Sequence, residues 1–441
     1  MSGRFRLRAL FVASTAIFAT CVGSASAGWS APRVLEPRCA ENAVNCPMET
    51  SPRVAVNARG QSVVAWVDAT GRVRAATGDR RGRFSRPVVF EKAFRPTVSI
   101  SAGGTVVVAW SRSSRLRFVR RSPGHRFTRP AQLVAPVSRL GDDFPKAAIQ
   151  PDGATLVLYE AADRTPTLGY QRQLRSVRIA PSGRPGRSIA VGAGSASRDG
   201  FGASPAGQVT VCCLTEPTAP TTAMRPIKVA TYAPGARWRV LAPPLGPRQV
   251  VETVSPGLGD VSLGTVDVRH SGDAGTSGAP GLLRADARGA FAAPLAAPVT
   301  NPGRAFGPVV AIDGTGRSVL VYQEKDDPSP FSRKAPLYAV TASRGGAFGA
   351  RRVLDRRLVR YPVMRSYRSG AIVAWEAPRN RWGIALERGG RFASAPVPAG
   401  PGPSNMGEDF VRNRDLTAAG RYTALAWTAA DATVRVSIGI L

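Results

Sequence analysis

The sequence predicts an all-β protein, a β-propeller of about eight four-stranded blades. Three observations favour this fold: a recurring glycine, an aromatic residue that follows it at a constant spacing, and a proline that precedes it. The glycine recurs about every 50 residues through most of the 441-residue chain. Tandem units of this length with four short strands are typical of propeller blades, because each blade has two apolar faces and buries them only against its neighbours.

The glycine and the aromatic residue define the repeat. The pairs six residues apart are Gly60 and Trp66, Gly104 and Trp110, Gly153 and Tyr159, and Gly316 and Tyr322. Two further pairs, Gly370 with Trp375 and Gly420 with Trp427, keep this frame to within one residue. The proline stands eight residues before the frame glycine at Pro52, Pro96, Pro145, Pro256, Pro308 and Pro362. Proline is tolerated at the start of a first strand because it has no N–H to donate to the ladder.

The residues of one unit predict a strand, a turn and three more strands. In VAVNARGQSVVAW, residues 54–66, polar and apolar residues alternate up to Gly60, and an apolar run follows. A short apolar run between turn residues indicates a strand that is buried on both faces. RVRAA (72–76) predicts the third strand, and RFSRPVVF (83–90), with its leading aromatic residue and its proline, predicts the fourth.

The two ends of the chain predict how the ring closes. GWSAPRVL, residues 28–35, matches the fourth-strand pattern but precedes any first strand, whereas the last unit contributes three strands and stops at Leu441. We therefore expect the N-terminal strand to complete the last blade, which removes a free sheet edge. Eight glycine frames predict eight blades. The alternative count of seven treats Val250–Pro298 as an insertion.

One strand pattern occurs twice, with a change of character. GTVVVAW (104–110) and GTVDVRH (264–270) are predicted to be the second strands of blades two and five. In this frame, Asp267 and Arg269 share one face, and His270 takes the position that Trp110 fills. An imidazole titrates near neutral pH, so His270 is a candidate general base. The favoured interpretation is a degenerate strand whose polar side chains face solvent.

The N-terminus predicts export. Arginines at positions 4, 6 and 8, an apolar stretch over residues 9–23 and the small-residue triplet Ala25-Ser26-Ala27 match a secretory signal peptide. We expect cleavage after Ala27, a single propeller domain over residues 28–441, and a secreted, extracellular protein. An alternative is a lipid anchor through Cys21. No later stretch is apolar enough for a transmembrane segment.

The composition predicts an anionic partner. The chain holds 60 Lys and Arg against 29 Asp and Glu, a net charge of +31. Such a surface attracts acidic glycans, wall polymers and anionic headgroups. No nucleic-acid module is visible, so nucleic acid would bind by charge alone and not specifically. We expect a monomer whose partner is a glycan or another anionic cell-surface polymer.

The cysteines predict a disulfide and no metal site. Cys39 and Cys46 lie close together in a polar loop, and a disulfide between them suits an oxidising compartment. Cys212 and Cys213 are interpreted as two buried thiols, with a vicinal disulfide as the alternative. Neither pair has metal-ligand spacing and the chain has two histidines, so no metal and no cofactor is expected.

The turn into the fourth strand resembles the Asp-box, Ser/Thr-x-Asp-x-Gly-x-Thr-Trp, of sialidase-type (BNR) β-propellers. Partial copies, none complete, comprise Thr77, Asp79 and Phe84; Ser122, Gly124 and Phe127; Thr231, Gly235 and Trp238; Thr341, Gly345 and Phe348; and Gly389 with Phe392. In that family the box is a structural turn remote from the catalytic centre, so the resemblance implies fold more than activity. The family's Phe/Tyr-Arg-Ile-Pro motif is matched only by Phe94-Arg95-Pro96, which lacks the Ile and is interpreted as packing.

Candidate functional residues lie in the loops that join strands two and three or successive blades, which chain order places on one face, the upper face. The weak catalytic candidates there are Glu160, Glu324, Asp326 and Asp327, since paired carboxylates can hydrolyse glycosides. The ligand-binding candidates are Asp142, Asp143, Glu408 and Asp409. Arginines predominate in the turns of the opposite, lower face. We expect a secreted module that binds glycans or other anionic polymers; the alternative is a sialidase-like glycoside hydrolase or polysaccharide lyase.

Overall fold

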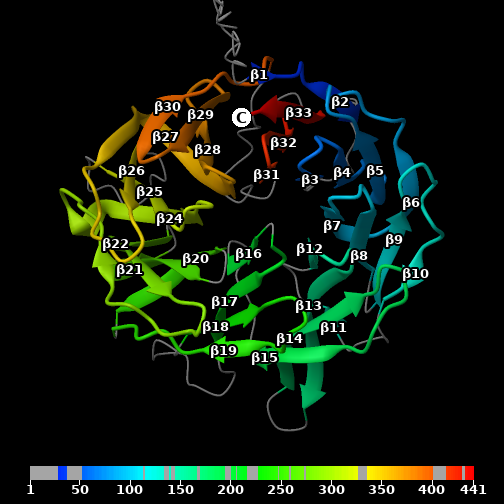
Figure 1. Cartoon of the computed structure of the whole chain (residues 1–441), viewed down its shortest axis with the longest axis horizontal. Coiled ribbons are helices and arrows are strands. Elements are labelled where there is room, and N and C mark those ends of the chain that lie inside the picture. The colour runs from blue at the N-terminus through cyan, green and yellow to red at the C-terminus, as the bar shows by residue number, and fades with distance from the viewer. Residues whose placement is uncertain are drawn as a thin grey trace, which may run out of the picture.

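The computed structural model is a ring of antiparallel β-sheets (Figure 1). It describes residues 28–36, 52–112, 115–133, 139–140, 145–165, 169–193, 200–204, 206–215, 227–246, 248–257, 260–272, 275–325, 335–400, 414–429 and 433–441. Within the blades the strands follow chain order from the centre outward, except that β1 and β2 pair with β33 and β11 pairs with β13. The first strands, such as β3, β7 and β12, lie near the centre of the ring, and the fourth strands, such as β6, β10 and β15, lie at its rim.

The first four blades follow the predicted units. Blade 1 holds β3 (Arg53–Val56), β4 (Ser62–Val67), β5 (Arg72–Gly78) and β6 (Val88–Lys92). Blade 2 holds β7 (Phe94–Ile100), β8 (Val106–Arg112), β9 (Arg115–Arg121) and β10 (Ala131–Gln132). Blade 3 holds β12 (Lys146–Ile149), β13 (Thr155–Thr165), β14 (Gly169–Ile179) and β15 (Ile189–Ala193), with β11 (Arg139–Leu140) on β13. Blade 4 holds β16 (Phe201–Ala203), β17 (Val209–Thr215), β18 (Ile227–Tyr232) and β19 (Arg239–Leu241).

The other four blades complete the ring. Blade 5 holds β20 (Gln249–Pro256), β21 (Val261–Gly272), β22 (Gly275–Ala285) and β23 (Leu295–Ala296). Blade 6 holds β24 (Ala305–Ile312), β25 (Ser318–Glu324), β26 (Ala335–Ala342) and the first part of β27 (Arg352–Tyr367). Blade 7 holds the rest of β27, β28 (Gly370–Ala377), β29 (Arg381–Arg388) and β30 (Arg391–Ser394). Blade 8 holds β31 (Arg414–Ala419), β32 (Tyr422–Thr428) and β33 (Val434–Ile440).

These sheets confirm the predicted fold class. The described residues form eight blades, and residues 249–296 form one of them, so the alternative of seven blades with an insertion there is wrong. β27 serves two blades because its first part pairs with β26 and its second part with β28.

The N-terminal strand closes the ring as predicted. β1 (Gly28–Trp29) and β2 (Arg33–Glu36) both pair with β33 in antiparallel register. Trp29 lies opposite Gly439, and Val34 lies opposite Arg435. The first described residues therefore supply the fourth strand of blade 8 (Figure 1, top).

The core lies between the blades. Every position of β4, β25, β28 and β32 is buried, which confirms that the apolar runs are second strands covered on both faces. One cluster joins Val64 and Trp66 of blade 1 to Ala424 and Ile438 of blade 8 and to Leu35 of the closing strand. Such shared clusters explain why an isolated blade cannot bury its apolar surface.

Blade 5 departs from the predicted frame. Its first turn is closed by the hydrogen bond from Gly257 N to Asp260 O (2.7 Å), so Gly264 lies inside β21 and not in a turn. Thr265, paired with Gly281, takes the position of Trp110, which pairs with Arg117. His270 lies further along β21, opposite Ser277, so its assignment to the Trp110 position is wrong. The cause is the long hairpin of β21 and β22, because β21 begins at Val261, before the glycine at which the repeat had predicted the turn.

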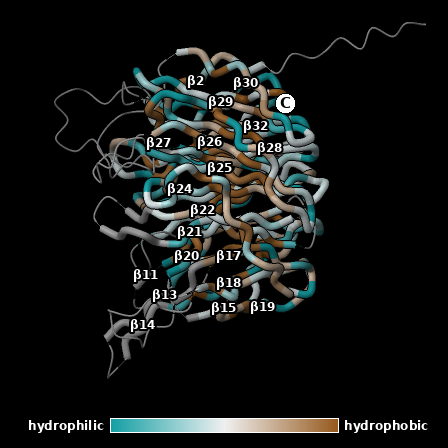
Figure 2. Tube along the Cα trace, turned by 90° about the vertical axis from the view of Figure 1, so that its left-hand side faces the viewer, coloured by the Kyte–Doolittle hydropathy of each residue, from teal (hydrophilic) through white to brown (hydrophobic). Residues whose placement is uncertain are grey.

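Two long hairpins, β13–β14 and β21–β22, distinguish the upper face from the lower. β13 and β14 have 11 residues each, whereas the neighbouring β8 and β9 have 7. Figure 2 shows β13 and β14 extending from one side of the ring. No helix in the described ranges has the length and the apolar character that crossing a bilayer requires.

In six blades the aromatic residue of the second strand lies opposite the same position of the third strand. Its partners are Arg74, Arg117, Arg175, Tyr338, Gly383 and Arg435 in blades 1, 2, 3, 6, 7 and 8. Trp375 covers Gly383 so closely that a Cβ there would lie 2.1 Å from Trp375 Cε2.

We therefore expect the substitution G383A to displace the Trp375 indole and to destabilise the protein by about 1–3 kcal/mol. Urea denaturation followed by tryptophan fluorescence measures the change in the free energy of unfolding. The matched control is G103A in an exposed turn, where the nearest heavy atom would lie 3.7 Å from the new Cβ. Equal stability of G383A and G103A would contradict the close packing.

Candidate functional site

The carboxylates at the upper ends of the rim strands join neighbouring blades. Glu91, in β6 of blade 1, accepts a hydrogen bond from Trp110 Nε1 of blade 2 at 3.1 Å. It also forms ion pairs with Arg112 and Arg117 of blade 2, the latter at 3.6 Å. Because the indole N–H and the guanidinium groups satisfy this carboxylate, it acts as a latch between two blades.

The same latch recurs at two other junctions. Glu36 accepts from Trp66 Nε1 at 3.2 Å, which ties the closing strand to blade 1. Asp355 of blade 6 accepts from Trp375 Nε1 of blade 7 at 2.9 Å and pairs with Arg357 at 2.7 Å. Burial alone would raise the pKa of Asp355, but the hydrogen bonds from Arg357 and Trp375 hold it below its ordinary value.

Glu324, one of the catalytic candidates, is held in a comparable network. Its carboxylate accepts from Asn301 N at 2.6 Å and pairs with Arg351, and the residue is 4% exposed. The adjacent Tyr322 donates its hydroxyl hydrogen to Pro298 O at 2.7 Å, and burial raises its pKa to about 12. A phenol with so high a pKa is poorly suited to act as a nucleophile near neutral pH.

The structure places the other predicted site residues as follows. Glu160 is 1% exposed in β13, and the backbone of His270 lies in β21, whereas its side chain lies outside the described residues. Also outside the described residues are Asp142, Asp143, Asp326, Asp327, Glu408 and Asp409, and the predicted disulfide between Cys39 and Cys46. Cys212 is disulfide-bonded and fully buried, so its interpretation as a free thiol is wrong.

The described acidic residues of the upper face are mostly buried. The loops there are rich in acidic residues in sequence, but the described carboxylates are largely enclosed by arginine and tryptophan. Side-chain exposure is 14% for Glu36, 1% for Asp68, 18% for Glu91 and 5% for Asp355. The described part of this face therefore carries little exposed negative charge.

The lower face carries exposed arginines in the turns between third and fourth strands. They are Arg80, Arg81, Arg126, Arg184, Arg237, Arg288 and Arg344, at least one from each of blades 1 to 6. In blade 7 the exposed Arg391 begins β30 directly after the turn. The carboxylates in these turns are used by the turns themselves. Asp79 accepts from Arg81 N (2.9 Å) and Arg83 N (3.0 Å), and Asp286 accepts from Arg288 N (2.8 Å) and Ala290 N (2.9 Å). The aspartates shape the turns, and the arginines point outward.

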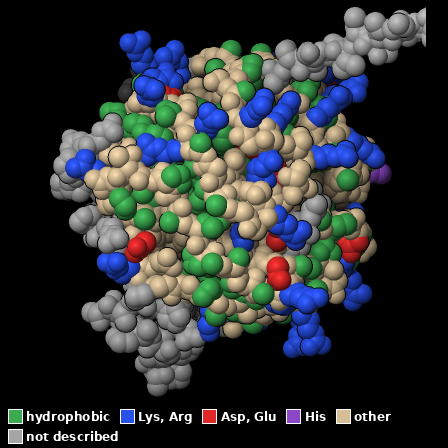
Figure 3. All heavy atoms as spheres, turned by 60° about the vertical axis from the view of Figure 1, so that its left-hand side comes forward, with side chains coloured by type: hydrophobic (Ala, Val, Ile, Leu, Met, Phe, Trp, Pro, Cys, Tyr) green, Lys and Arg blue, Asp and Glu red, His purple; other side chains and the backbone are tan. Residues whose placement is uncertain are grey.

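At the junction of blades 4 and 5, Arg239 of β19 adjoins the turn of blade 5 that holds Arg288. Arg239 donates to Ala287 O at 3.0 Å and to Arg288 O, which holds the turn of blade 5 against blade 4. Arg237 and Arg288 are exposed. Figure 3 shows that Lys and Arg side chains outnumber Asp and Glu over the face in view.

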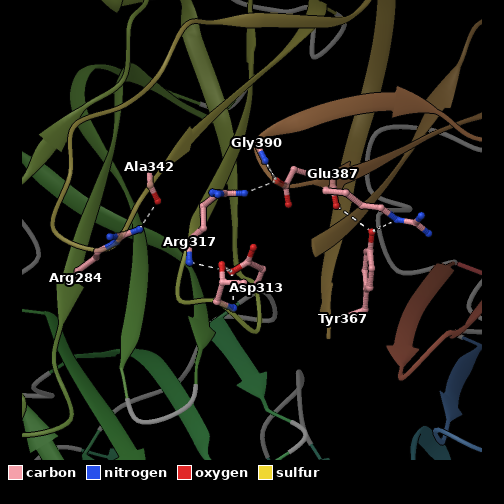
Figure 4. Close-up of polar contacts among 9 residues, drawn as sticks. Arg284, Asp313, Arg317, Ala342, Tyr367, Glu387 and Gly390 are labelled. Atoms are coloured by element: carbon pink, nitrogen blue, oxygen red, sulfur yellow. Dashed lines mark hydrogen bonds and ion pairs between the residues drawn. The ribbon is translucent and has the colours of Figure 1, made fainter. Parts of the chain in front are cut away.

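A buried polar cluster lies further along the lower face, where blades 6 and 7 adjoin (Figure 4). Arg317 Nη1 donates to Glu387 Oε1 at 3.5 Å, and Tyr367 donates its hydroxyl hydrogen to the backbone oxygen of Glu387 at 2.9 Å. Burial raises the pKa of Tyr367 and of Glu387. Because these groups are enclosed, they are out of reach of a polymeric ligand.

Sequence reasoning did not single out the pair of Asp313 and Glu387 in this cluster. A signal existed only for Asp313, which precedes the frame glycine Gly316 as Asn57 precedes Gly60. Nothing in the spacing pointed to Glu387, because it comes from a different blade. Within the described ranges, no group of three or more His, Cys, Asp or Glu side chains is placed to hold a metal ion.

Comparison with known proteins leaves the family open. No family model and no curated protein matches the chain. Among solved structures, it is similar to the polysaccharide lyase Uly1 (9% identity, TM-score 0.47, 90% of each chain covered). It is also similar to an α-L-arabinanase of Penicillium chrysogenum complexed with arabinobiose (12%, TM-score 0.37, 78% of this chain and 92% of that chain).

A third similar structure is a puromycin hydrolase mutant complexed with PGG (16% identity, TM-score 0.48, 90% of this chain). The chain spans 62% of the length of that hydrolase. Likeness at this level identifies no protein whose activity transfers to this chain. The Asp-box resemblance therefore stays a prediction, and the chain is a β-propeller whose family is not shown.

Proposed function

We propose that the protein is an exported binding module that attaches to anionic polymers, acidic glycans above all, through the arginines of its lower-face turns. One observation carries the proposal: the aspartates of these turns are bound to their own backbone, while the arginines are exposed. Guanidinium groups form paired hydrogen bonds with carboxylate and sulfate-like groups, which are the charged groups of acidic glycans.

The arrangement suits a long ligand better than a small one. The exposed arginines come from successive blades, so a linear polyanion can contact several turns at once and gain affinity by multivalency. The alternative, a glycoside hydrolase or lyase on the upper face, requires carboxylates that a substrate can reach. Glu160 and Glu324, the candidates that the structure describes there, are 1% and 4% exposed, which supports binding over hydrolysis.

The test is the double variant R237E/R288E. On immobilised heparin and polygalacturonate, we expect the parent protein to bind with strong salt dependence and the variant to bind about 10–100-fold more weakly, because two attractive contacts become repulsive. Neutral dextran should bind neither. Release of reducing ends or unsaturated products, measured alongside, tests the enzymatic alternative.

The matched control reverses two exposed arginines of the upper face, in R115E/R381E. This variant has the same net charge as R237E/R288E, so a specific lower-face surface predicts that its affinity stays within about threefold of the parent. An equal loss in both variants would show attraction by net charge alone, and the proposed surface would be wrong.

A further inference from the structure

Two buried carboxyl groups meet at the junction of blades 6 and 7. Asp313 follows β24 and is 3% exposed, and Glu387 lies in β29 and is fully buried. Figure 4 shows the Glu387 carboxyl group at the guanidinium of Arg317 and the Asp313 carboxyl group at the backbone N–H of the same residue. Neither Asp313 Oδ2 nor Glu387 Oε2 has a hydrogen-bond partner among the described residues.

The other oxygen of each carboxyl group is fully used. Asp313 Oδ1 accepts from Thr315 N at 2.9 Å, from Thr315 Oγ1 at 2.6 Å and from Arg317 N at 2.9 Å. Glu387 Oε1 accepts from Gly390 N at 2.6 Å and from Arg317 Nη1 at 3.5 Å. Arg317 thus contacts Asp313 through its backbone N–H and Glu387 through its guanidinium, and the remaining oxygen of each carboxyl group lacks a donor among the described residues.

The repeat shows what this position requires. Asn57 is the equivalent of Asp313 in blade 1, and its Oδ1 likewise accepts from two backbone N–H groups of its own turn, Arg59 N and Gln61 N, both at 3.0 Å. Its Nδ2 donates to Ser101 O of blade 2 at 2.9 Å. The atom that faces the next blade is therefore a donor in blade 1, whereas an ionised Asp313 offers only acceptors there.

The surrounding charged groups do not supply the missing donor. Tyr367 donates to the backbone oxygen of Glu387, and Arg388 Nε donates to the Tyr367 hydroxyl at 3.2 Å. Arg284 is committed to Ala342 O at 2.7 Å and to Ser318 Oγ at 2.8 Å. An ionised Glu387 in this buried place, repelled by the charge of Asp313 and contacted by the Arg317 guanidinium at 3.5 Å, carries a large desolvation cost, so a further positive charge is required.

We propose that Asp313 and Glu387 form a proton-binding site that holds one proton at neutral pH and so joins blades 6 and 7. The proton comes from solvent and lies on Glu387, with its O–H directed to Asp313 Oδ2. The pair then carries one negative charge, which Arg317 balances.

The raised pKa of Glu387 sets the direction in which the stability of the folded protein changes with pH. Burial, and then the charge of Asp313, raise the pKa of Glu387 above its ordinary value of 4.5, despite the opposing contacts of Gly390 and Arg317. A carboxyl group with a raised folded-state pKa stabilises the folded protein fully below its unfolded pKa. This contribution is lost as pH rises from the unfolded-state pKa through the folded-state pKa, and between the two values the unfolding equilibrium constant increases about tenfold per pH unit.

The test compares D313N with N57D, which exchange the residue types of the two equivalent positions. Urea denaturation is measured from pH 5 to pH 9, and each variant is subtracted from the parent to cancel the other titrating groups. We expect D313N to lose the parent's pH-dependent weakening, because Asn donates to Glu387 at every pH. N57D should gain a new weakening of at least tenfold in the unfolding equilibrium constant at neutral pH, relieved at acid pH.

A second variant, E387Q, keeps the proposal testable should D313N fold poorly. It should flatten the same pH profile and remove the infrared band of a protonated carboxyl group that we expect in the parent protein at neutral pH. Parallel pH profiles of the parent and both variants would overturn the proposal. So would a chelator that destabilises the parent but not D313N, because a metal ion would then occupy the place of the proton.

Discussion

Deletion of residues 28–36 should leave the last blade without its fourth strand, so that the ring of blades cannot close. We expect it to lower the free energy of unfolding by more than about 4 kcal/mol. The closing strand pairs with β33 along its length, and it places Leu35 in the core that joins blades 1 and 8. Its last residue, Glu36, accepts the Trp66 hydrogen bond and so latches the strand to the next blade. Without these residues β33 presents an unpaired edge, which favours aggregation or pairing between chains.

Urea denaturation and size-exclusion chromatography with light scattering measure the two consequences. The matched control uses adjacent residues of β2: Leu35 is 9% exposed and faces the core, whereas Val34 is 50% exposed. L35A should cost about 2–4 kcal/mol and V34A less than about 0.5 kcal/mol. A deleted chain that stays monomeric with parental stability would show that closure by this strand is dispensable.

The second large effect is expected at Trp110. Its side chain is fully buried, stacks on Phe90 with ring centroids 5.3 Å apart, and donates to Glu91. W110A removes this packing between blades 1 and 2 and should cost about 3–5 kcal/mol. W110F keeps most of the apolar contact but leaves Glu91 without the indole donor, so we expect a smaller loss of about 1–3 kcal/mol.

A double-mutant cycle of W110F and E91Q separates packing from the latch. If the latch is real, the two substitutions should couple by about 1 kcal/mol, because W110F removes the indole donor and E91Q removes the charge that strengthens the same hydrogen bond. The control pair combines W110F with R115A, an exposed residue, and should be additive. A coupling energy of zero for W110F and E91Q would show that the hydrogen bond between Trp110 and Glu91 does not stabilise the junction of blades 1 and 2.

Much of the fold could be predicted from the sequence. The frame glycines Gly60 and Gly104, with Trp66 and Trp110 six residues later, located the turns and the buried second strands of their blades. The pattern failed in blade 5, where the elongated hairpin moved the turn to residues 257–260 and left His270 outside the repeat position. A fixed spacing cannot register a change in strand length.

The site was less predictable, because it depends on residues from different blades. Glu91 and Glu324 were visible as acidic residues near the ends of strands, but not that Trp110, Arg117 and Arg351 enclose them. Partners that lie in neighbouring blades share no spacing rule in the sequence. The proximity of Asp313 and Glu387 could not be predicted for the same reason, because the two residues belong to different blades.

The repeat, the favoured count of eight blades and the strand that closes the ring could be read from the amino-acid sequence, since these depend on local turn chemistry and on apolar runs that most blades repeat. The sequence also determined the excess of positive charge. Which charges remain exposed depends on how the blades stack. Stacking encloses the acidic residues of the upper rim with tryptophan and arginine and leaves the lower-turn arginines in solvent. Exposure is a property of neighbouring blades, and that is why no single segment of the chain could reveal it.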